Sequence, residues 1–155
     1  MAQEIEKKFL VKGDFMSDVE KSTRIIQGYL CSVPERTVRV RTKGDQGFLT
    51  VKGIGNESGT SRYEWEREIS VEDATDLLKI SEPGVIDKTR YNVKSGGHTF
   101  EVDEFYGEND GLIVAEVELS AEDEDFIKPS WLGEEVTGQV KYYNSMLMKT
   151  PYKTW

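Results

Sequence analysis

The chain has 155 residues, close to the size of one typical domain, so a single domain over residues 1–155 is expected. Its 20 Lys and Arg residues against 29 Asp and Glu residues give a formal net charge of −9. This charge excludes nucleic-acid binding over the whole surface but allows a local cationic site. Hydrophobic residues make up 37%, and no apolar run approaches the roughly 18 residues that cross a bilayer, which excludes a helical membrane protein.

Short segments with a two-residue period, separated by turn residues about every ten positions, indicate an antiparallel, mainly β fold. The glycines of residues 44–47, Gly-Asp-Gln-Gly, favour a hairpin loop between the third and fourth strands, because glycine readily adopts a positive φ. Eight strands are expected in all, at residues 3–12, 24–32, 36–43, 47–53, 61–69, 85–94, 98–106 and 112–119.

Three short helical segments are expected beside the strands. The start signal Ser-x-x-Asp at residues 70–73, with apolar residues at helical spacing behind it, predicts a helix over residues 71–80. The same signal at residues 120–123 predicts a brief helix that ends before Pro129. Apolar residues along one side of residues 138–148 predict a closing helix.

The cysteine and histidine content limits both compartment and metal chemistry. The lone Cys31 cannot form an intramolecular disulfide and the charged start of the chain is not a signal peptide, so a cytoplasmic location is expected. The single His98, in the turn sequence Ser-Gly-Gly-His, excludes a multi-histidine metal site and is expected to be an exposed turn residue.

The charged side chains of the expected strands are sorted by sign. Successive side chains on a strand point to opposite faces, so residues two apart share a face. Pairs of this kind are Arg39 and Arg41, Lys88 and Arg90, Glu4 and Glu6, Glu64 and Glu66, Glu101 and Asp103, and Glu116 and Glu118. Like charges on neighbouring positions repel, so the arrangement is costly unless a ligand of opposite sign binds there.

The two kinds of charged face predict a polyphosphate and a divalent metal ion. Arg presents a planar donor fork to phosphate oxygens, and Lys adds a point charge. Mg²⁺ commonly takes one or two carboxylates together with phosphate oxygens. Two glutamates separated by one strand residue aim both carboxylates at one volume, about 7 Å apart. Such a site would suit phosphoryl transfer to water.

One set of motifs runs through essentially the whole chain. It begins with Glu4-x-Glu6-x-Lys8. The further members are Gln27-Gly28-Tyr29-Leu30, Arg39-x-Arg41, Thr50-Val51-Lys52, Ser61-Arg62 with Glu64 and Glu66, Lys88-Thr89-Arg90-Tyr91, Glu101-x-Asp103, Glu116-x-Glu118, and Trp131 to Thr137 followed by Lys141-Tyr142. In this order the motifs resemble the CYTH domain of the triphosphate tunnel metalloenzymes, whose signature is ExExK. The small bacterial members, inorganic triphosphatases and adenylate cyclase-like proteins, are the most similar.

The resemblance implies a closed eight-stranded antiparallel β-barrel, or triphosphate tunnel, with a few short flanking helices. It implies hydrolysis of tripolyphosphate to phosphate and pyrophosphate with Mg²⁺ or Mn²⁺, and weaker activity on nucleoside or thiamine triphosphates. Carried over by position, the substrate-binding residues would be Lys8, Arg39, Arg41, Lys52, Arg62, Lys88, Arg90 and Lys141. The metal ligands would be Glu4, Glu6, Asp103, Glu116 and Glu118.

The resemblance further implies that Lys8, Glu64 and Glu66 act in catalysis itself. Lys8 would contact the phosphoryl group that is transferred or displaced. Glu64 and Glu66 would line the tunnel and orient water, or would instead hold the arginines in a network of salt bridges.

Two other functions remain open. A class IV-type adenylate cyclase would bind the triphosphate with the same residues, and a non-catalytic module would bind polyphosphate without turnover. The expected partner is a small-molecule triphosphate, with neither nucleic acid nor membrane. Trp65 and Trp155 are candidates for an interface, so a homodimer is among the expected assemblies.

Overall fold

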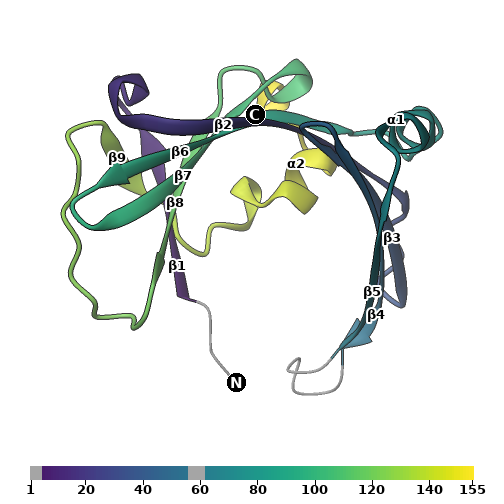
Figure 1. Ribbon diagram of the computed structural model, residues 1–155. Helices are drawn as coiled ribbons and strands as arrows, with labels where there is room; N and C mark the ends of the chain where they lie inside the picture. Colours follow the sequence, from purple (N-terminus) through teal and green to yellow (C-terminus); the bar gives the residue numbers. More distant parts are fainter. Residues whose placement is uncertain (1–4, 56–61) are drawn as a thin grey trace. The chain divides into compact units, whose positions relative to one another are not determined.

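The protein is built mainly from β-strands, and the computed structural model describes residues 5–55 and 62–155. The strands are β1 (Ile5–Val11), β2 (Val19–Cys31), β3 (Arg36–Lys43), β4 (Gln46–Gly55), β5 (Arg62–Ile69), β6 (Ile86–Ser95), β7 (His98–Phe105), β8 (Ile113–Leu119) and β9 (Leu132–Glu135) (Figure 1). The eight expected strands are confirmed, and β9 is an additional one.

The strands hydrogen-bond in the order β5-β4-β3-β2-β6-β7-β8-β1-β9, in an antiparallel sheet. Strands β5 and β9 stand at the two ends of this order and do not pair with each other within residues 5–55 and 62–155. The expected closure into an eight-stranded barrel is therefore not confirmed. The ninth strand arises because residues 132–135 add to the free edge of β1.

The helices are α1 (Val71–Lys79) and α2 (Asn144–Lys149), with short 3-10 turns η1 (Met16–Asp18), η2 (Gly107–Asn109), η3 (Val140–Tyr142) and η4 (Tyr152–Thr154). Helix α1 is confirmed, and the hydroxyl oxygen of Ser70 accepts a hydrogen bond from the Asp73 N–H as its cap. The closing helix expected over 138–148 is confirmed only from Asn144 onward, because Tyr143 is extended (φ −74°, ψ 141°) and separates η3 from α2. Among the described helices, none has the length and apolar character needed to cross a membrane.

The expected helix after Ser120 is wrong, and the same contacts correct the expectation for His98. Instead of capping a helix, the Ser120 N–H and hydroxyl both donate to the Glu124 carboxylate, at 2.7 and 2.5 Å. The other Glu124 oxygen lies 2.5 Å from Nε2 of His98. His98 is the first residue of β7 and is half-buried, not an exposed turn residue.

The chain forms two compact units: the central unit, Arg24–Asp87, and the terminal unit, which comprises Lys88–Trp155 and the residues before Arg24. In the central unit α1 packs on β3 and β4, and Val40 and Ala74 are fully buried. Gly47 makes this packing possible, because a Cβ there would lie 2.8 Å from both the Ala74 Cβ and the Ser70 carbonyl oxygen. Gly44 takes the positive φ of the hairpin turn, 63°.

The terminal unit has an apolar core on one face of its strands. Phe9, Phe100, Val102 and Val117 are buried there together with Trp131. Since side chains alternate along a strand, the neighbours of these residues face the opposite way. The core therefore fixes a second face that carries Lys8 on β1, Glu101 and Asp103 on β7, and Glu116 and Glu118 on β8.

Candidate functional site

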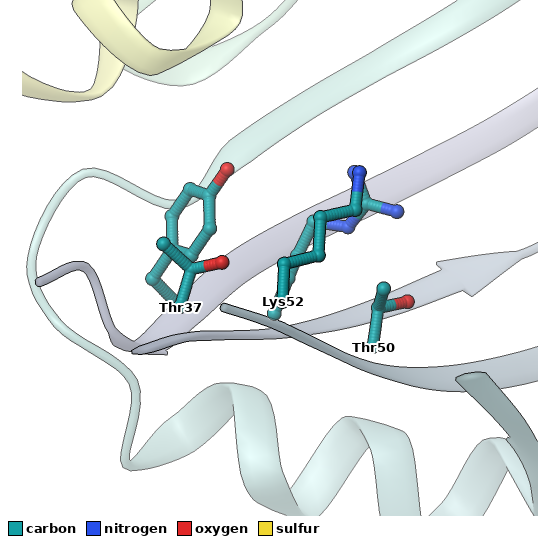
Figure 2. A pocket seen from close by; sticks show the side chains of 5 residues that line it. Thr37, Thr50 and Lys52 are labelled. Carbon is teal, nitrogen blue, oxygen red and sulfur yellow. The ribbon is translucent and has the colours of Figure 1, made fainter. Parts of the chain in front are cut away.

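The central unit carries a row of polar side chains across its strands. Tyr29 of β2 lies opposite Arg39 of β3, Arg39 opposite Thr50 of β4, and Thr50 opposite Glu66 of β5. A second row is formed by Thr37, Lys52 and Glu64. A hollow of about 80 Å³ is lined by Tyr29, Thr37, Arg39, Thr50 and Lys52 (Figure 2).

The carboxylates of these rows hold hydroxyl and ammonium groups of the hollow. The Thr50 hydroxyl, on a fully buried side chain, donates to the Glu66 carboxylate at 2.7 Å. The Lys52 ammonium lies 3.8 Å from the Glu64 carboxylate. Nε of Arg39 is buried and makes no hydrogen bond within the described part of the chain. A buried donor without an acceptor is costly, so the hollow suits a ligand that supplies anionic oxygen.

The second charged face, that of the terminal unit, carries both acids and bases. Strand register places Lys8 opposite Glu116 and Glu6 opposite Glu118. It places Glu116 opposite Glu101 on the next strand. The ExExK side chains after Glu4 therefore share a face with both glutamates of β8, as strand parity predicts.

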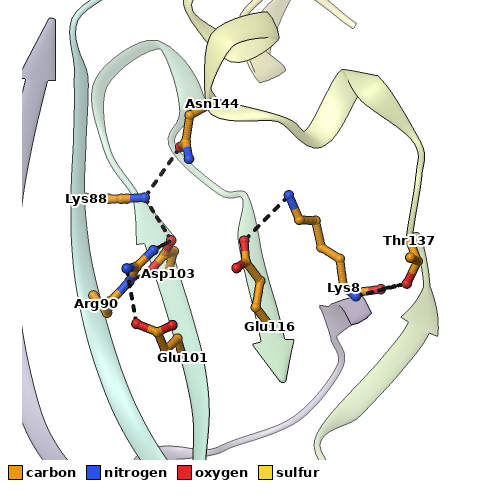
Figure 3. Close-up of polar contacts among 8 residues, drawn as sticks. All are labelled: Lys8, Lys88, Arg90, Glu101, Asp103, Glu116, Thr137 and Asn144. Carbon is orange, nitrogen blue, oxygen red and sulfur yellow. Dashed lines mark hydrogen bonds and ion pairs between the residues drawn. The ribbon is translucent and has the colours of Figure 1, made fainter. Parts of the chain in front are cut away.

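A buried ion-pair network lies at one end of this face. The Lys88 ammonium donates to the Asp103 carboxylate at 2.9 Å, and Arg90 donates to both oxygens of the same carboxylate at 2.8 and 2.9 Å (Figure 3). Arg90 also lies 3.1 Å from Glu101. Lys88 and Asp103 are only 2% and 4% exposed. One carboxylate thus orders two cations on the face.

The network lowers the pKa of Lys88 and of Asp103 and raises that of Arg90. Burial lowers the pKa of Lys88, and the charge of Asp103 only partly offsets this. Burial disfavours the charged form of Asp103, but the Arg90 hydrogen bonds and the Lys88 charge outweigh it and hold the Asp103 pKa below its ordinary value. Burial also opposes the charge of Arg90, yet Asp103 and Glu101 raise its pKa overall.

Lys8 is fixed by its backbone and its side chain. Its N–H donates to the Thr137 hydroxyl at 3.0 Å, and its carbonyl accepts from the Val136 N–H at 2.7 Å. The Lys8 ammonium lies 3.5 Å from Glu116 and 4.7 Å from the ring centroid of Tyr143. The segment that follows β9 therefore holds Lys8 in register.

The donor set of the terminal unit fits a hard divalent cation. Carboxylate oxygens are the ligand type that Mg²⁺ and Mn²⁺ prefer. Neighbouring strands offer them from Glu6, Glu101, Glu116 and Glu118. Within residues 5–55 and 62–155, no three such side chains are already close enough together to hold a metal ion.

The family model described as the CYTH domain matches residues 2–150. The chain belongs to the CYTH family. The match includes the Glu4-x-Glu6-x-Lys8 signature, the two rows of polar side chains in the central unit, and the buried ion-pair network of the terminal unit.

Relatives of this CYTH chain cover nearly its whole length. It is 48% identical over 156 positions to a protein of Acetivibrio thermocellus named inorganic triphosphatase, with 100% of this chain and 99% of the relative covered. It is 38% identical over 148 positions to an inorganic triphosphatase of Nitrosomonas europaea, covering 93% and 95%. The crystal structure of the inorganic triphosphatase NE1496 superposes with a TM-score of 0.81, at 35% identity, covering 96% of this chain and 95% of that one.

Three expected CYTH site residues cannot be placed on either charged face. Glu4 lies outside the described residues, and so does the side chain of Arg62. The ammonium of Lys141 lies over two aromatic rings, 5.2 Å from the centroid of Tyr142 and 4.6 Å from that of Trp155. Arg41 lies outside the two rows, opposite Gln27 of β2 and Phe48 of β4. The remaining expected residues lie in the central-unit rows or on the charged face of the terminal unit.

Residues without charge complete both faces, and the sequence pattern does not distinguish them. Thr37 lines the central hollow, and Thr137, Tyr143 and Asn144 contact the lysines of the terminal unit. Tyr29 and Thr137 belong to motifs of the family resemblance, which is the one signal that could have found them. Tyr143 and Asn144 have no such signal, because a helical reading places Tyr143 among core residues.

Proposed function

We propose that this CYTH protein is a metal-dependent triphosphatase that hydrolyses inorganic triphosphate to phosphate and pyrophosphate. The observation that carries the proposal is the 48% identity, along the whole chain, to a relative named inorganic triphosphatase. The two charged faces support it, because they combine fixed cations with oxygen donors for a divalent ion.

Six cations are proposed to bind phosphate oxygens: Lys8, Arg39, Arg41, Lys52, Lys88 and Arg90. Asp103 supports this role, because it holds Lys88 and Arg90 in place before substrate binds. Arg62 remains a proposal from the family pattern alone. Lys141, whose ammonium lies over the Tyr142 and Trp155 rings, likewise remains a proposal from the family pattern alone.

Four glutamates are proposed to hold Mg²⁺ or Mn²⁺: Glu4, Glu6, Glu116 and Glu118. Asp103 is left out of this set, because both of its oxygens accept hydrogen bonds from Arg90. A bound divalent ion supplies charge neutralisation and Lewis acidity to the phosphoryl oxygens. Glu66 and Glu64 are proposed to orient Thr50 and Lys52, with which they pair.

The reaction breaks the anhydride bond of a terminal phosphoryl group. Water oxygen bonds to that phosphorus, pyrophosphate leaves, and one proton is released. Lys8 and the other cations would stabilise the negative charge that builds on the transferred and leaving oxygens.

The proposal has three further parts. These are the closed tunnel, the single domain over 1–155, and a homodimer through Trp65 or Trp155.

Product analysis tests the function. With Mg²⁺ or Mn²⁺, tripolyphosphate should yield phosphate and pyrophosphate, faster than ATP or thiamine triphosphate yields phosphate. Formation of cyclic AMP and pyrophosphate from ATP would instead support a class IV-type cyclase. Tight tripolyphosphate binding without turnover would support a non-catalytic module.

A further inference from the structure

Two adjacent residues at the start of α2 contact the two lysines of the terminal unit. The Lys8 ammonium lies 4.7 Å from the Tyr143 ring centroid. The Lys88 ammonium lies 3.4 Å from Oδ1 of Asn144, which projects toward it from α2 (Figure 3). Neighbouring residues in the chain therefore touch both ammonium groups.

Buried anchors on either side fix this pair of residues. Tyr142 before it and Leu147 after it are buried, the latter completely. The Tyr143 carbonyl accepts hydrogen bonds from the N–H groups of Met146 and Leu147, both at 2.9 Å. The anchors leave Tyr143 and Asn144 little freedom to move away from the lysines.

Neutral partners orient a cation without cancelling its charge. A lysine ammonium sits on a flexible four-carbon stem, so its place is set by what it touches. The Tyr143 ring attracts the Lys8 ammonium through its π face. This contact is not a conventional hydrogen bond to any of the three N–H donors. The Asn144 carbonyl oxygen accepts one hydrogen bond from Lys88 and carries no charge. Each lysine already faces one carboxylate, Glu116 for Lys8 and Asp103 for Lys88, so the uncharged partners add orientation without adding a second counter-charge.

We propose that Tyr143 and Asn144 are positioning residues, which hold the ammonium groups of Lys8 and Lys88 for the triphosphate. The proposal rests on the proposed function. It adds two uncharged residues, the N-cap and the first residue of α2, to a site built otherwise from strand side chains.

Tyr143→Leu tests the first contact. It should lower kcat on tripolyphosphate about 3- to 30-fold, the range expected from the loss of one ammonium–ring contact, with little change in KM. Tyr143→Phe keeps the ring and should stay within about twofold of the unaltered protein. The matched control is Tyr152→Leu, which removes a ring packed on Trp155 and should lower the melting temperature while sparing kcat.

Asn144→Ala tests the second contact. It should lower kcat about 2- to 10-fold, as expected for one lost hydrogen bond. Ser145→Ala alters the next, exposed residue of α2 and should leave kcat unchanged. Equal losses in Asn144→Ala and Ser145→Ala would overturn the role of Asn144. The role of Tyr143 fails if Tyr143→Leu keeps full kcat, or if Tyr143→Phe is equally impaired.

A spectroscopic measurement separates this proposal from the proposed function. The Tyr143 ring current should move the NMR signals of the Lys8 ε-methylene protons upfield, in Tyr143→Phe as well as in the unaltered protein. The shift should vanish in Tyr143→Leu. No turnover of tripolyphosphate by the unaltered protein would contradict the function, whereas a Lys8 signal insensitive to Tyr143→Leu would contradict the positioning contact.

Discussion

The Lys88 ammonium nitrogen lies 2.9 Å from Oδ2 of Asp103, and both side chains are almost completely buried. Arg90 occupies both oxygens of the same carboxylate. Taking three charged groups out of water is tolerated only when each finds its partners. This carboxylate therefore keeps two cations ordered on the charged face of the terminal unit.

The Asp103→Asn substitution should strongly destabilise the protein. It leaves Lys88 buried without a full counter-charge, and breaking a buried ion pair typically costs about 3–5 kcal/mol of unfolding free energy. Urea unfolding monitored by circular dichroism measures the loss. Asp76→Asn, in an ion pair whose side chains are 72% and 71% exposed, is the control and should change little. Equal effects of the two substitutions would contradict the network's importance.

The Arg39→Ala substitution should weaken substrate binding more than folding. It removes a charge-assisted contact worth about 1.5–3 kcal/mol from the central hollow. Calorimetric titration with tripolyphosphate measures the affinity, and thermal unfolding measures stability. Val38→Thr, which alters the opposite face of β3, should lower the melting temperature and leave affinity intact. An Arg39→Ala protein with full affinity and a lower melting temperature would show that the arginine is structural.

Chelation of divalent ions should abolish turnover of tripolyphosphate. Glutamates that face one another, such as Glu6 and Glu118, can help a polyanion bind only through a cation. Glu118→Gln should lower kcat by about two orders of magnitude or more, as is typical when one electrostatic contact to the transition state is lost. Activity is measured in EDTA and again after Mg²⁺ or Mn²⁺ is restored. Full activity in EDTA would refute the metal requirement.

The Lys8→Ala substitution should lower kcat more than it raises KM. The Lys8 charge becomes more valuable as negative charge builds in the transition state. Steady-state kinetics on tripolyphosphate separate the two constants. A raised KM with an intact kcat would make Lys8 a contributor to uniform ground-state binding.

The Glu124 carboxylate should make stability depend on pH in the acid range. Its hydrogen bonds from Ser120 and its pairing with His98 lower the pKa of Glu124 from 4.5 to about 2. The folded state binds this proton less tightly than the unfolded state, so the stabilisation is present above pH 4.5 and is lost as the pH falls toward 2. Melting temperatures of the unaltered protein and Glu124→Gln should differ most at pH 6, differ less at pH 3 and converge toward pH 2. A constant difference would contradict the assignment.

Strand positions and faces could be predicted from the sequence because they depend on local alternation. The core of Phe9, Phe100 and Val117 leaves Lys8 and Glu116 on the other face, as parity requires. The sequence could not show that Ser120 caps no helix. Its hydrogen-bond partner Glu124 is held by His98, which reaches it only through tertiary contact. Strand β9 has only four residues and gains its stability from the edge of β1, which no local pattern reveals.

The charged members of the candidate site were identifiable, whereas their partners were not. Sorting by sign singles out Lys88, Arg90 and Asp103, but it cannot tell a metal ligand from a buried counter-ion. That distinction depends on which atoms approach the Asp103 oxygens. Tyr143 is similarly ambiguous, because an aromatic residue at helical spacing fits a core as well as it fits an ammonium group.

The pairing of β1 has a consequence for the order of folding during synthesis. β1 pairs with β8 and β9, and the hydrogen bond from the Lys8 N–H to Thr137 closes a separation of 129 positions. Contacts of such long range form only after the entropy of closing a long loop is paid. Strand β1 therefore waits for a partner that is synthesised 129 positions after Lys8. A nascent chain that stalls before residue 113 carries Glu6 and Lys8 on a strand with neither of these partners.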